Sequence, residues 1–307
     1  MASEIEAPDL SSKPLEFLCA VLGRSDEEQP GTKSLSALVS PDPSRPYVTL
    51  TFAQSLDAKI AGRAGLQLIL SGDESMKMTH WMRTMHDGIL IGIGTALNDN
   101  PQLNVRHLPF PKQGGHLEYY HHPRPLILDP HLRLSPKCKL IKNASLKAGV
   151  MPWVISARPY PDVVQVEGQD RVADWESRKA AIEDAGAKIL LVDVELPASS
   201  RTSSYLPIKA VLEAIRAEGI QSVMVEGGAR IILSFLSAAT QDELVDSLIV
   251  TVAPVIVGAH GVGYSELLDD IPALQHVRTE ALGKDVVMGM KVVKSILQNK
   301  ATGQHYD

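Results

Sequence analysis

The sequence predicts an α/β protein whose central sheet is covered by helices on both faces. Of its 307 residues, 44% are hydrophobic and 21% are charged, as in ordinary globular proteins. Several apolar runs are continuous instead of alternating with polar residues, which is typical of strands buried on both faces. Segments with helical patterns separate these runs along the chain. Together these observations favour a largely parallel sheet flanked by helices.

Residues 1–45 differ in composition from the rest of the chain. They contain five prolines and many serines, interrupted by the apolar run Leu15–Leu22. We therefore expect an N-terminal arm over residues 1–45 with one short helix, followed by a globular domain over residues 46–307.

From residue 46 onward, predicted strands and helices alternate. Strands are expected at 46–53, 66–70, 87–94, 124–129, 152–156, 187–193, 222–226, 245–257 and 285–293. Helices are expected at 71–86, 175–185, 206–219 and 229–239. Ser71 with Glu74 three residues later is a capping pattern, and Gly219 is the expected C-cap residue. The last two strands have no helical segment between them, so one edge of the sheet should be mixed. Residues 106–123 and 258–284 are expected to be loops.

Charge and cysteine content exclude several classes of protein. The chain has 30 basic and 36 acidic side chains, a net charge of −6, without the basic patch that a nucleic-acid or acidic-membrane surface needs. Two cysteines, Cys19 and Cys138, cannot form a disulfide framework or a cysteine zinc site. The apolar runs are too short for a membrane span, and no signal peptide is evident. We expect a cytoplasmic protein.

Two glycine-bearing strand ends are candidate phosphate sites. Gly92 and Gly94 follow one buried strand, and Gly227 and Gly228 stand where another strand turns into a helix. Glycine lets the backbone approach a phosphate closely, and a helix N-terminus favours negative charge. Such glycines are also common in turns that bind nothing. The first is not a Rossmann fingerprint, because Leu97 replaces the third glycine.

Five segments carry a family resemblance, and they occur in order along residues 46–293. They are SLDAKIA (55–61), MRTMHDGILIGIGTALNDNPQLNVR (82–106), RPLILD (124–129), VMVEGGARI (223–231) and VDSLIVTVAPVIVG (245–258). The joint pattern resembles the pyrimidine reductases of riboflavin biosynthesis. It is most similar to their stand-alone fungal and archaeal form, the 2,5-diamino-6-ribosylamino-4(3H)-pyrimidinone 5′-phosphate reductases.

This resemblance implies a dihydrofolate-reductase-like fold with a mixed, mostly parallel sheet, NADPH as hydride donor, and a homodimer. It makes residues 46–307 a reductase domain. Bacterial relatives fuse this domain to a zinc deaminase with H-x-E and P-C-x-x-C motifs. Neither motif is present here, so we expect a reductase without a metal.

The resemblance assigns most of the cofactor residues. Thr95 and Asp99 match a T-x-x-x-D pattern that contacts the dinucleotide. The family's E-G-G-A run corresponds to Glu226, Gly227, Gly228 and Ala229, followed by Arg230. Ile69 aligns with a cofactor contact. For the 2′-phosphate of NADPH we select Ser156 and Arg158 on chemical grounds, because they follow a strand and offer a hydroxyl and a cation.

The resemblance also assigns substrate residues. Arg83 and Arg106 match positions that hold the ribose phosphate, and a guanidinium suits phosphate because it donates two hydrogen bonds at once. Leu103 matches an apolar or backbone substrate contact next to Arg106, and Gln67 aligns with a further substrate contact. Asp57, at a strand end, is a candidate for binding the pyrimidine or donating a proton.

The expected reaction is hydride transfer to C1′ of the ring-opened ribosyl group, which gives the ribitylamine. Asp57 and Glu226 are both candidate catalytic carboxyl groups, and the sequence does not rank them. Two alternatives stay open: a reductase of the same fold acting on another pteridine or pyrimidine, and a non-catalytic nucleotide-binding protein.

Overall fold

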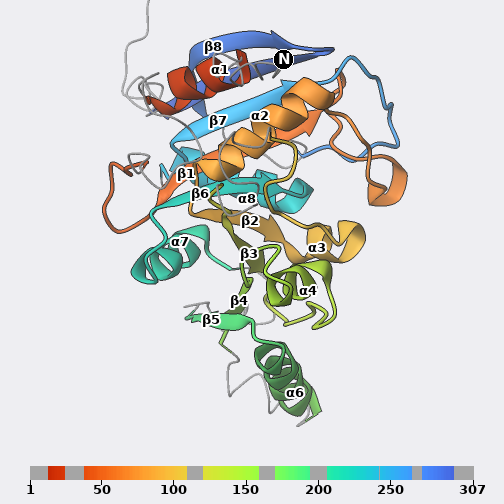
Figure 1. The fold of residues 1–307 in the computed structure, drawn as a ribbon, viewed down its shortest axis with the longest axis vertical. Coiled ribbons are helices and arrows are strands. Elements are labelled where there is room, and N and C mark those ends of the chain that lie inside the picture. Colours follow the sequence, from red (N-terminus) through yellow and green to blue (C-terminus); the bar gives the residue numbers. More distant parts are fainter. Residues whose placement is uncertain are drawn as a thin grey trace, which may run out of the picture.

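The computed structural model describes residues 13–24, 38–108, 120–158, 170–193, 206–241, 243–264 and 272–293. They form one nine-stranded sheet in the order β5-β4-β3-β2-β6-β1-β7-β9-β8 (Figure 1). The neighbours from β5 to β7 pair in parallel, whereas β9 pairs antiparallel with both β7 and β8. The predicted mixed, mostly parallel sheet is confirmed.

The strands have these bounds: β1 Tyr47–Gln54, β2 Gly88–Gly92, β3 Arg124–Leu128, β4 Trp153–Ala157, β5 Lys188–Val192, β6 Ser222–Gly227, β7 Ser247–Val252, β8 Ala273–Leu282 and β9 Asp285–Val293. The helices are α1 Lys13–Leu22, α2 Asp73–Thr84, α3 Ile93–Asp99, α4 Lys139–Ser145, α6 Asp170–Asp184, α7 Ile208–Ala217 and α8 Ala229–Gln241, with a 3₁₀ turn, η1, at Arg63–Gly65.

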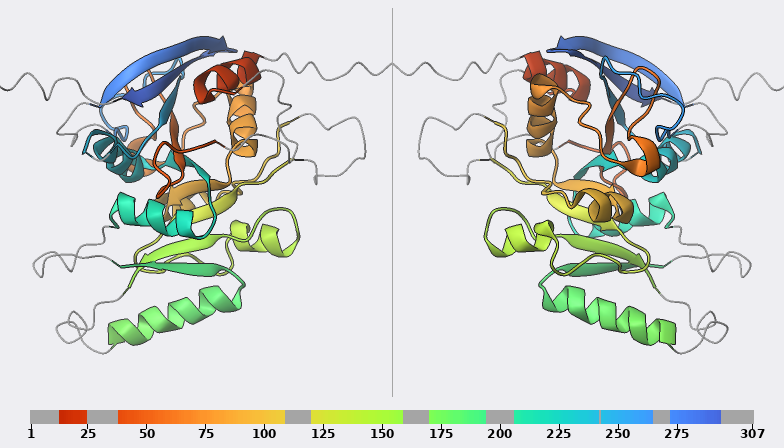
Figure 2. Two further views of the ribbon diagram at one scale, coloured as in Figure 1. Left: turned by 90° about the vertical axis from the view of Figure 1, so that its left-hand side faces the viewer. Right: turned by 90° about the vertical axis from the view of Figure 1, so that its right-hand side faces the viewer.

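Both faces of the sheet are buried, which explains the continuous apolar runs. Along β6, Val223 and Val225 belong to the core beneath α7 and α8, whereas Met224 between them packs with α1 and α2 on the other face. Successive side chains of a strand point to opposite faces, so a strand covered on both sides has no polar alternate. Figure 2 shows α1 and α2 on one side of the sheet and α7 and α8 on the other.

The predicted helix in the N-terminal arm is present as α1, and it is packed into the core. Phe17, Leu18 and Val21 are fully buried beside α2, β8 and β9. A Cβ atom on Gly289 of β9 would lie 2.2 Å from a Val21 methyl group, so α1 lies directly on the strand backbone. α1 therefore covers the antiparallel end of the sheet.

Two sequence predictions about strands are wrong. Residues 66–70 form no strand; Leu66 is 70% and Ile69 87% exposed, and the segment lies along a cleft. Conversely, β8 lies within the predicted loop 258–284. It is a mostly exposed edge strand, so its sequence lacks the apolar run used to find the buried strands.

The predicted cap of α2 is also wrong. Its N-cap residue is Gly72, without a side-chain cap from its own segment. The buried carboxylate of Asp285, at the start of β9, instead accepts hydrogen bonds from the Gly72 N–H (2.7 Å) and the Ser75 hydroxyl. A residue over 200 positions away supplies the cap, which no local pattern predicts.

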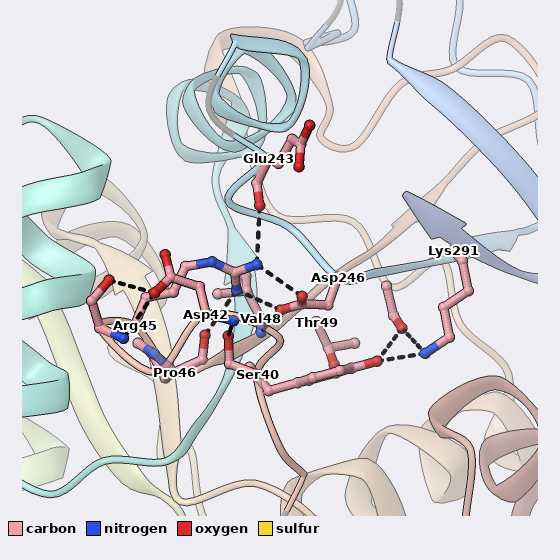
Figure 3. Close-up of polar contacts among 12 residues, drawn as sticks. Ser40, Asp42, Arg45, Pro46, Val48, Thr49, Glu243, Asp246 and Lys291 are labelled. Atoms are coloured by element: carbon pink, nitrogen blue, oxygen red, sulfur yellow. Dashed lines mark hydrogen bonds and ion pairs between the residues drawn. The ribbon is translucent and has the colours of Figure 1, made fainter. Parts of the chain in front are cut away.

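A polar network joins the amino ends of β1 and β7 (Figure 3). The Arg45 guanidinium donates to both carboxylate oxygens of Asp246, at 2.7 and 2.9 Å, and the Val48 N–H donates to the same carboxylate at 2.7 Å. Beside this pair, the Lys291 ammonium donates to Tyr47 Oη at 2.6 Å and to Ser247 Oγ at 3.0 Å. We call these five side chains, Arg45, Tyr47, Asp246, Ser247 and Lys291, the amino-end network. It holds β1, β7 and β9 together.

Candidate active site

A cleft of about 760 Å³ lies at the carboxyl ends of the parallel strands, opposite the amino-end network. Its walls come from the ends of β1, β2, β3 and β6, the segment Gln67–Ser71 and the start of α8. Ligands of open α/β sheets bind at this edge because loops and helix N-termini converge there. The cleft is therefore the candidate active site.

The two predicted glycine turns meet in this cleft because β2 and β6 are neighbours. The Thr95 hydroxyl, near the start of α3, donates to the Gly227 carbonyl at 3.0 Å. Gly228 has φ +104°, and a Cβ atom there would lie 2.7 Å from Thr95 Oγ1. Gly228 is thus required by the backbone conformation and by this close approach, before any ligand is considered.

Gly94 differs from Gly228 in this respect. It lines the cleft, and a Cβ atom there would meet no atom within 4 Å. Its missing side chain leaves open space at the N-terminus of α3. Asp99, at the other end of α3, also lines the cleft, and burial raises the pKa of its carboxyl group.

Glu226 faces the cleft as one half of an ion pair. Arg83 donates to it through Nε (3.0 Å) and through one terminal nitrogen (2.8 and 2.9 Å), and the side chains are 9% and 20% exposed. Arg83 also donates to the Asn104 carbonyl at 3.0 Å. The Arg83 guanidinium is only 9% exposed and is already bonded to Glu226 and to the Asn104 carbonyl, so its predicted contact with the ribose phosphate has less support than a role in holding Glu226.

Arg106 is the exposed cation near the Arg83–Glu226 pair, and it lies next to the cleft lining, not within it. It donates to Asn104 Oδ1 at 2.8 Å, and burial together with the positive charge of Arg83 lowers its pKa, partly offset by Glu226. Its backbone N–H donates to Nδ1 of His80 at 3.2 Å. Burial, followed by the charges of Arg83 and Arg106, lowers the pKa of His80 to about 2, so this ring is neutral. The carboxyl-end cluster therefore comprises Arg83, Glu226, Arg106, Asn104 and His80.

His80 and Asn104 were not predicted from the sequence. His80 lies on α2 with the appearance of an ordinary helix residue, and Asn104 lies in a loop. Only the fold shows that Asn104 accepts hydrogen bonds from both arginine side chains and that His80 accepts one from the Arg106 backbone.

Asp57 is outside the cleft lining and holds two loops together. It accepts hydrogen bonds from the Ser55 hydroxyl (2.6 Å), the Val257 N–H (3.0 Å) and the Gly258 N–H (2.7 Å). These bonds, with that from Ser55 the largest cause, lower its pKa to about 2. Asp57 is therefore ionised near neutral pH, which argues against the predicted role as proton donor.

The residues selected for the 2′-phosphate also lie outside the cleft lining. Ser156 is fully buried and donates to the Pro130 carbonyl at 2.9 Å. Arg158 forms an exposed ion pair with Asp193 at 2.7 Å. The Ser156 hydroxyl already bonds a backbone carbonyl, and Arg158 is already paired with a carboxylate. Neither residue is therefore supported as a ligand of the 2′-phosphate.

Of the remaining predicted contact residues, some line the cleft and one is buried in the core. Gln67 and Ile69 line the cleft, as do Ala229 and Arg230 at the start of α8. Leu103 is 3% exposed and packs in the core beneath α3, so its side chain is not offered to a ligand. Among the described residues, no group of His, Cys, Asp and Glu is placed to hold a metal ion. Over the same part of the chain, no helix is long and apolar enough to cross a membrane.

Comparisons with known proteins place the chain among riboflavin-biosynthesis reductases. The model of the RibD C-terminal domain matches residues 46–288. The 2,5-diamino-6-ribosylamino-4(3H)-pyrimidinone 5′-phosphate reductase of Debaryomyces hansenii is 35% identical over 238 residues, covering 76% of this chain and 86% of that protein. The Schizosaccharomyces pombe protein of the same name is 30% identical over 261 residues, covering 83% and 91%.

A solved structure is also similar. The riboflavin biosynthesis reductase of Saccharomyces cerevisiae has a TM-score of 0.56 at 27% identity, covering 83% of this chain and 93% of that one.

Proposed function

Because the chain belongs to the RibD C-terminal domain family, we propose that it reduces 2,5-diamino-6-ribosylamino-4(3H)-pyrimidinone 5′-phosphate to its ribitylamino product with NADPH. The observation that carries this proposal is the meeting of Thr95, Glu226 and Gly228 in one cleft, with Arg106 beside Glu226. A dinucleotide needs a glycine turn with a neighbouring hydroxyl group, and a phosphorylated substrate needs a nearby cation.

The cleft fits a dinucleotide on structural grounds. Its volume is about 760 Å³, the ends of four strands line it, and the open space at Gly94 admits a ligand close to the backbone. Thr95, Asp99 and the segment Gly228–Arg230 would hold the cofactor, with the α8 N-terminus toward the pyrophosphate. When bound, NADPH would supply the hydride.

The substrate would lie at the Glu226 end of the cleft. Arg106 is exposed outside the cleft lining, with Glu226 among its charged neighbours, and suits the ribose phosphate, whereas Arg83 positions Glu226. Holding the acceptor carbon against the hydride donor contributes much of the rate in such reactions.

Glu226 has an electrostatic role in this proposal. When the C1′–O4′ bond breaks, the amine nitrogen becomes part of a cationic C=N group, and O4′ takes up a proton. A carboxylate facing the cleft stabilises that positive charge until C1′ receives the hydride. Asp57, outside the cleft, holds the loops that follow β1 and β7.

The substrate is a small molecule, and we propose that the protein acts as a homodimer in the cytoplasm. Light scattering coupled to gel filtration tests the dimer. The activity is tested by anaerobic assay of NADPH consumption with the ribosylaminopyrimidine phosphate. Formation of a product two mass units heavier than the substrate supports the proposal. Absence of NADPH oxidation with intact ribosylaminopyrimidine phosphate would reject it.

A further inference from the structure

The turn at residues 129–134, which follows β3, presents two basic side chains to the cleft. His131 and Arg133 are exposed and line the cleft, whereas Leu132 and Leu134 are 1% and 3% exposed and pack in the core. The alternation means that two apolar anchors hold the turn while the two basic residues face outward.

Hydrogen bonds fix the shape of this turn. Asp129 is fully buried; its carboxylate accepts from the Leu134 N–H at 2.8 Å, and its carbonyl accepts from the Leu132 N–H at 3.2 Å. The Ser156 hydroxyl holds the Pro130 carbonyl from the neighbouring strand β4. Hydrogen bonds to Asp129 and from Ser156 therefore fix the backbone of this turn.

Arg133 is placed by the same carboxylate. Its Nε lies 3.8 Å from Asp129 Oδ1, an oxygen that has no hydrogen bond within the described part of the chain. The Arg133 side chain is nevertheless 49% exposed. The buried Asp129 carboxyl group, whose pKa burial raises, thus lies near a guanidinium that remains half-exposed at the cleft.

The position of the turn in the sheet relates it to one half of a dinucleotide. The strand ends that line the cleft follow the order β3, β2, β6, β1. The glycine turns follow β2 and β6, and Glu226, where we propose that the substrate lies, belongs to β6. β3 adjoins β2 on the side away from β6 and β1 (Figure 1). The nicotinamide must be close to the substrate, so the adenosine of the same cofactor extends toward β3.

We infer that Arg133, with His131 beside it, binds the phosphate on the adenosine 2′-oxygen and thereby selects NADPH over NADH. The inference rests on the proposed function for the orientation of the cofactor. A guanidinium matches a phosphate because its planar fork donates two parallel hydrogen bonds. Arg230, at the start of α8, is the rival cation in the cleft lining, and it lies beside the glycine turn instead.

The test compares two adenosine nucleotides that differ at the 2′-oxygen. Calorimetry measures binding of 2′,5′-ADP and of 5′-AMP to the full chain and to Arg133→Gln. We expect Arg133→Gln to weaken 2′,5′-ADP binding about 10- to 100-fold, the effect of losing hydrogen bonds to a charged group, and to leave 5′-AMP binding within about twofold. Arg158→Gln is the matched control outside the cleft and should change neither affinity.

Several results would overturn the inference: unchanged 2′,5′-ADP affinity in Arg133→Gln, an equal loss for both nucleotides, or a selective loss in Arg230→Gln instead. Equal affinity of the unaltered protein for both nucleotides would also reject it. The proposed function fails differently. A protein that binds 2′,5′-ADP through Arg133 but does not oxidise NADPH with the pyrimidine substrate would keep this site and lose the assigned reaction.

Discussion

Two arginine–carboxylate pairs lie at opposite edges of the parallel part of the sheet, and they differ in what surrounds them. Arg45 and Asp246 at the amino ends are 5% and 8% exposed, and Asp246 also accepts a backbone N–H. Arg83 and Glu226 at the carboxyl ends are similarly bidentate, but Glu226 is 20% exposed and borders a cleft. The first pair is enclosed by the fold, whereas the second presents charge to a ligand.

The comparison shows why an ion pair alone does not identify a site. Both pairs have nearly the same geometry and join elements far apart in sequence. They differ in the second cation: Lys291 near the first donates to two hydroxyl groups, whereas Arg106 near the second is exposed. The second pair belongs to the candidate site because its carboxylate, Glu226, borders the cleft.

The largest expected effect is on stability at the amino ends. Asp246→Ala leaves the Arg45 guanidinium buried without its partner, which typically costs about 3–5 kcal/mol of the free energy of unfolding. Urea unfolding followed by circular dichroism measures the loss. Because hydrophobic replacement of both partners is often tolerated, Arg45→Met with Asp246→Leu should recover much of it. A loss below about 1 kcal/mol in the single variant would show that the pair is not a stabilising element.

At the carboxyl ends the main effect should be on turnover. Glu226→Gln removes the negative charge facing the cationic C=N group, and we expect kcat to fall about 100-fold or more, as for other preorganised electrostatic groups. Asp57→Asn should leave kcat within about threefold while lowering the melting temperature, because Asp57 holds loops outside the cleft. A large loss of kcat in Asp57→Asn with only a small loss in Glu226→Gln would reverse these assignments.

Acidic pH should lower the free energy of unfolding, because two buried histidines are neutral in the folded protein. Burial lowers the pKa of His86, which contacts Thr49 on β1, to about 4 and that of His80 to about 2, from 6.5. Below pH 6.5 the unfolded chain binds protons that the folded chain does not, so stability falls as pH falls. Each histidine contributes up to about 1.4 kcal/mol per pH unit, between pH 6.5 and 4 for His86. Urea titrations at pH 7.5, 6.5 and 5.5 measure the slope, and a flat profile would contradict this origin.

The smallest change concerns the open space at Gly94. Gly94→Leu adds a side chain that meets no protein atom at its Cβ, in a helix where glycine is unfavourable. We expect unchanged or slightly higher stability and NADPH binding weakened about tenfold or more. Gly228→Ala is the contrasting variant: it strains a φ of +104° and approaches Thr95, so it should lower stability as well. Normal NADPH affinity in Gly94→Leu would move the cofactor away from α3.

Local patterns in the sequence were sufficient for much of the architecture. Apolar runs located eight of the nine strands near their observed positions, and the antiparallel pairing of β9 with β7 agrees with the predicted mixed edge. The edge strand β8 was missed, because exposed strands lack such a run. The apolar segment at 66–70 was misassigned because its side chains line the cleft instead of joining the sheet.

The sequence by itself determined the α/β class, the family and the two glycine turns, because these depend on composition, periodicity and short contiguous motifs. Tertiary structure decided the role of each polar side chain. Asp57 and Glu226 are indistinguishable as sequence candidates, but one accepts three hydrogen bonds from nearby loops and the other faces the cleft beside two arginines. A carboxylate's function depends on its solvation and its neighbours, and both are set by segments distant in the chain.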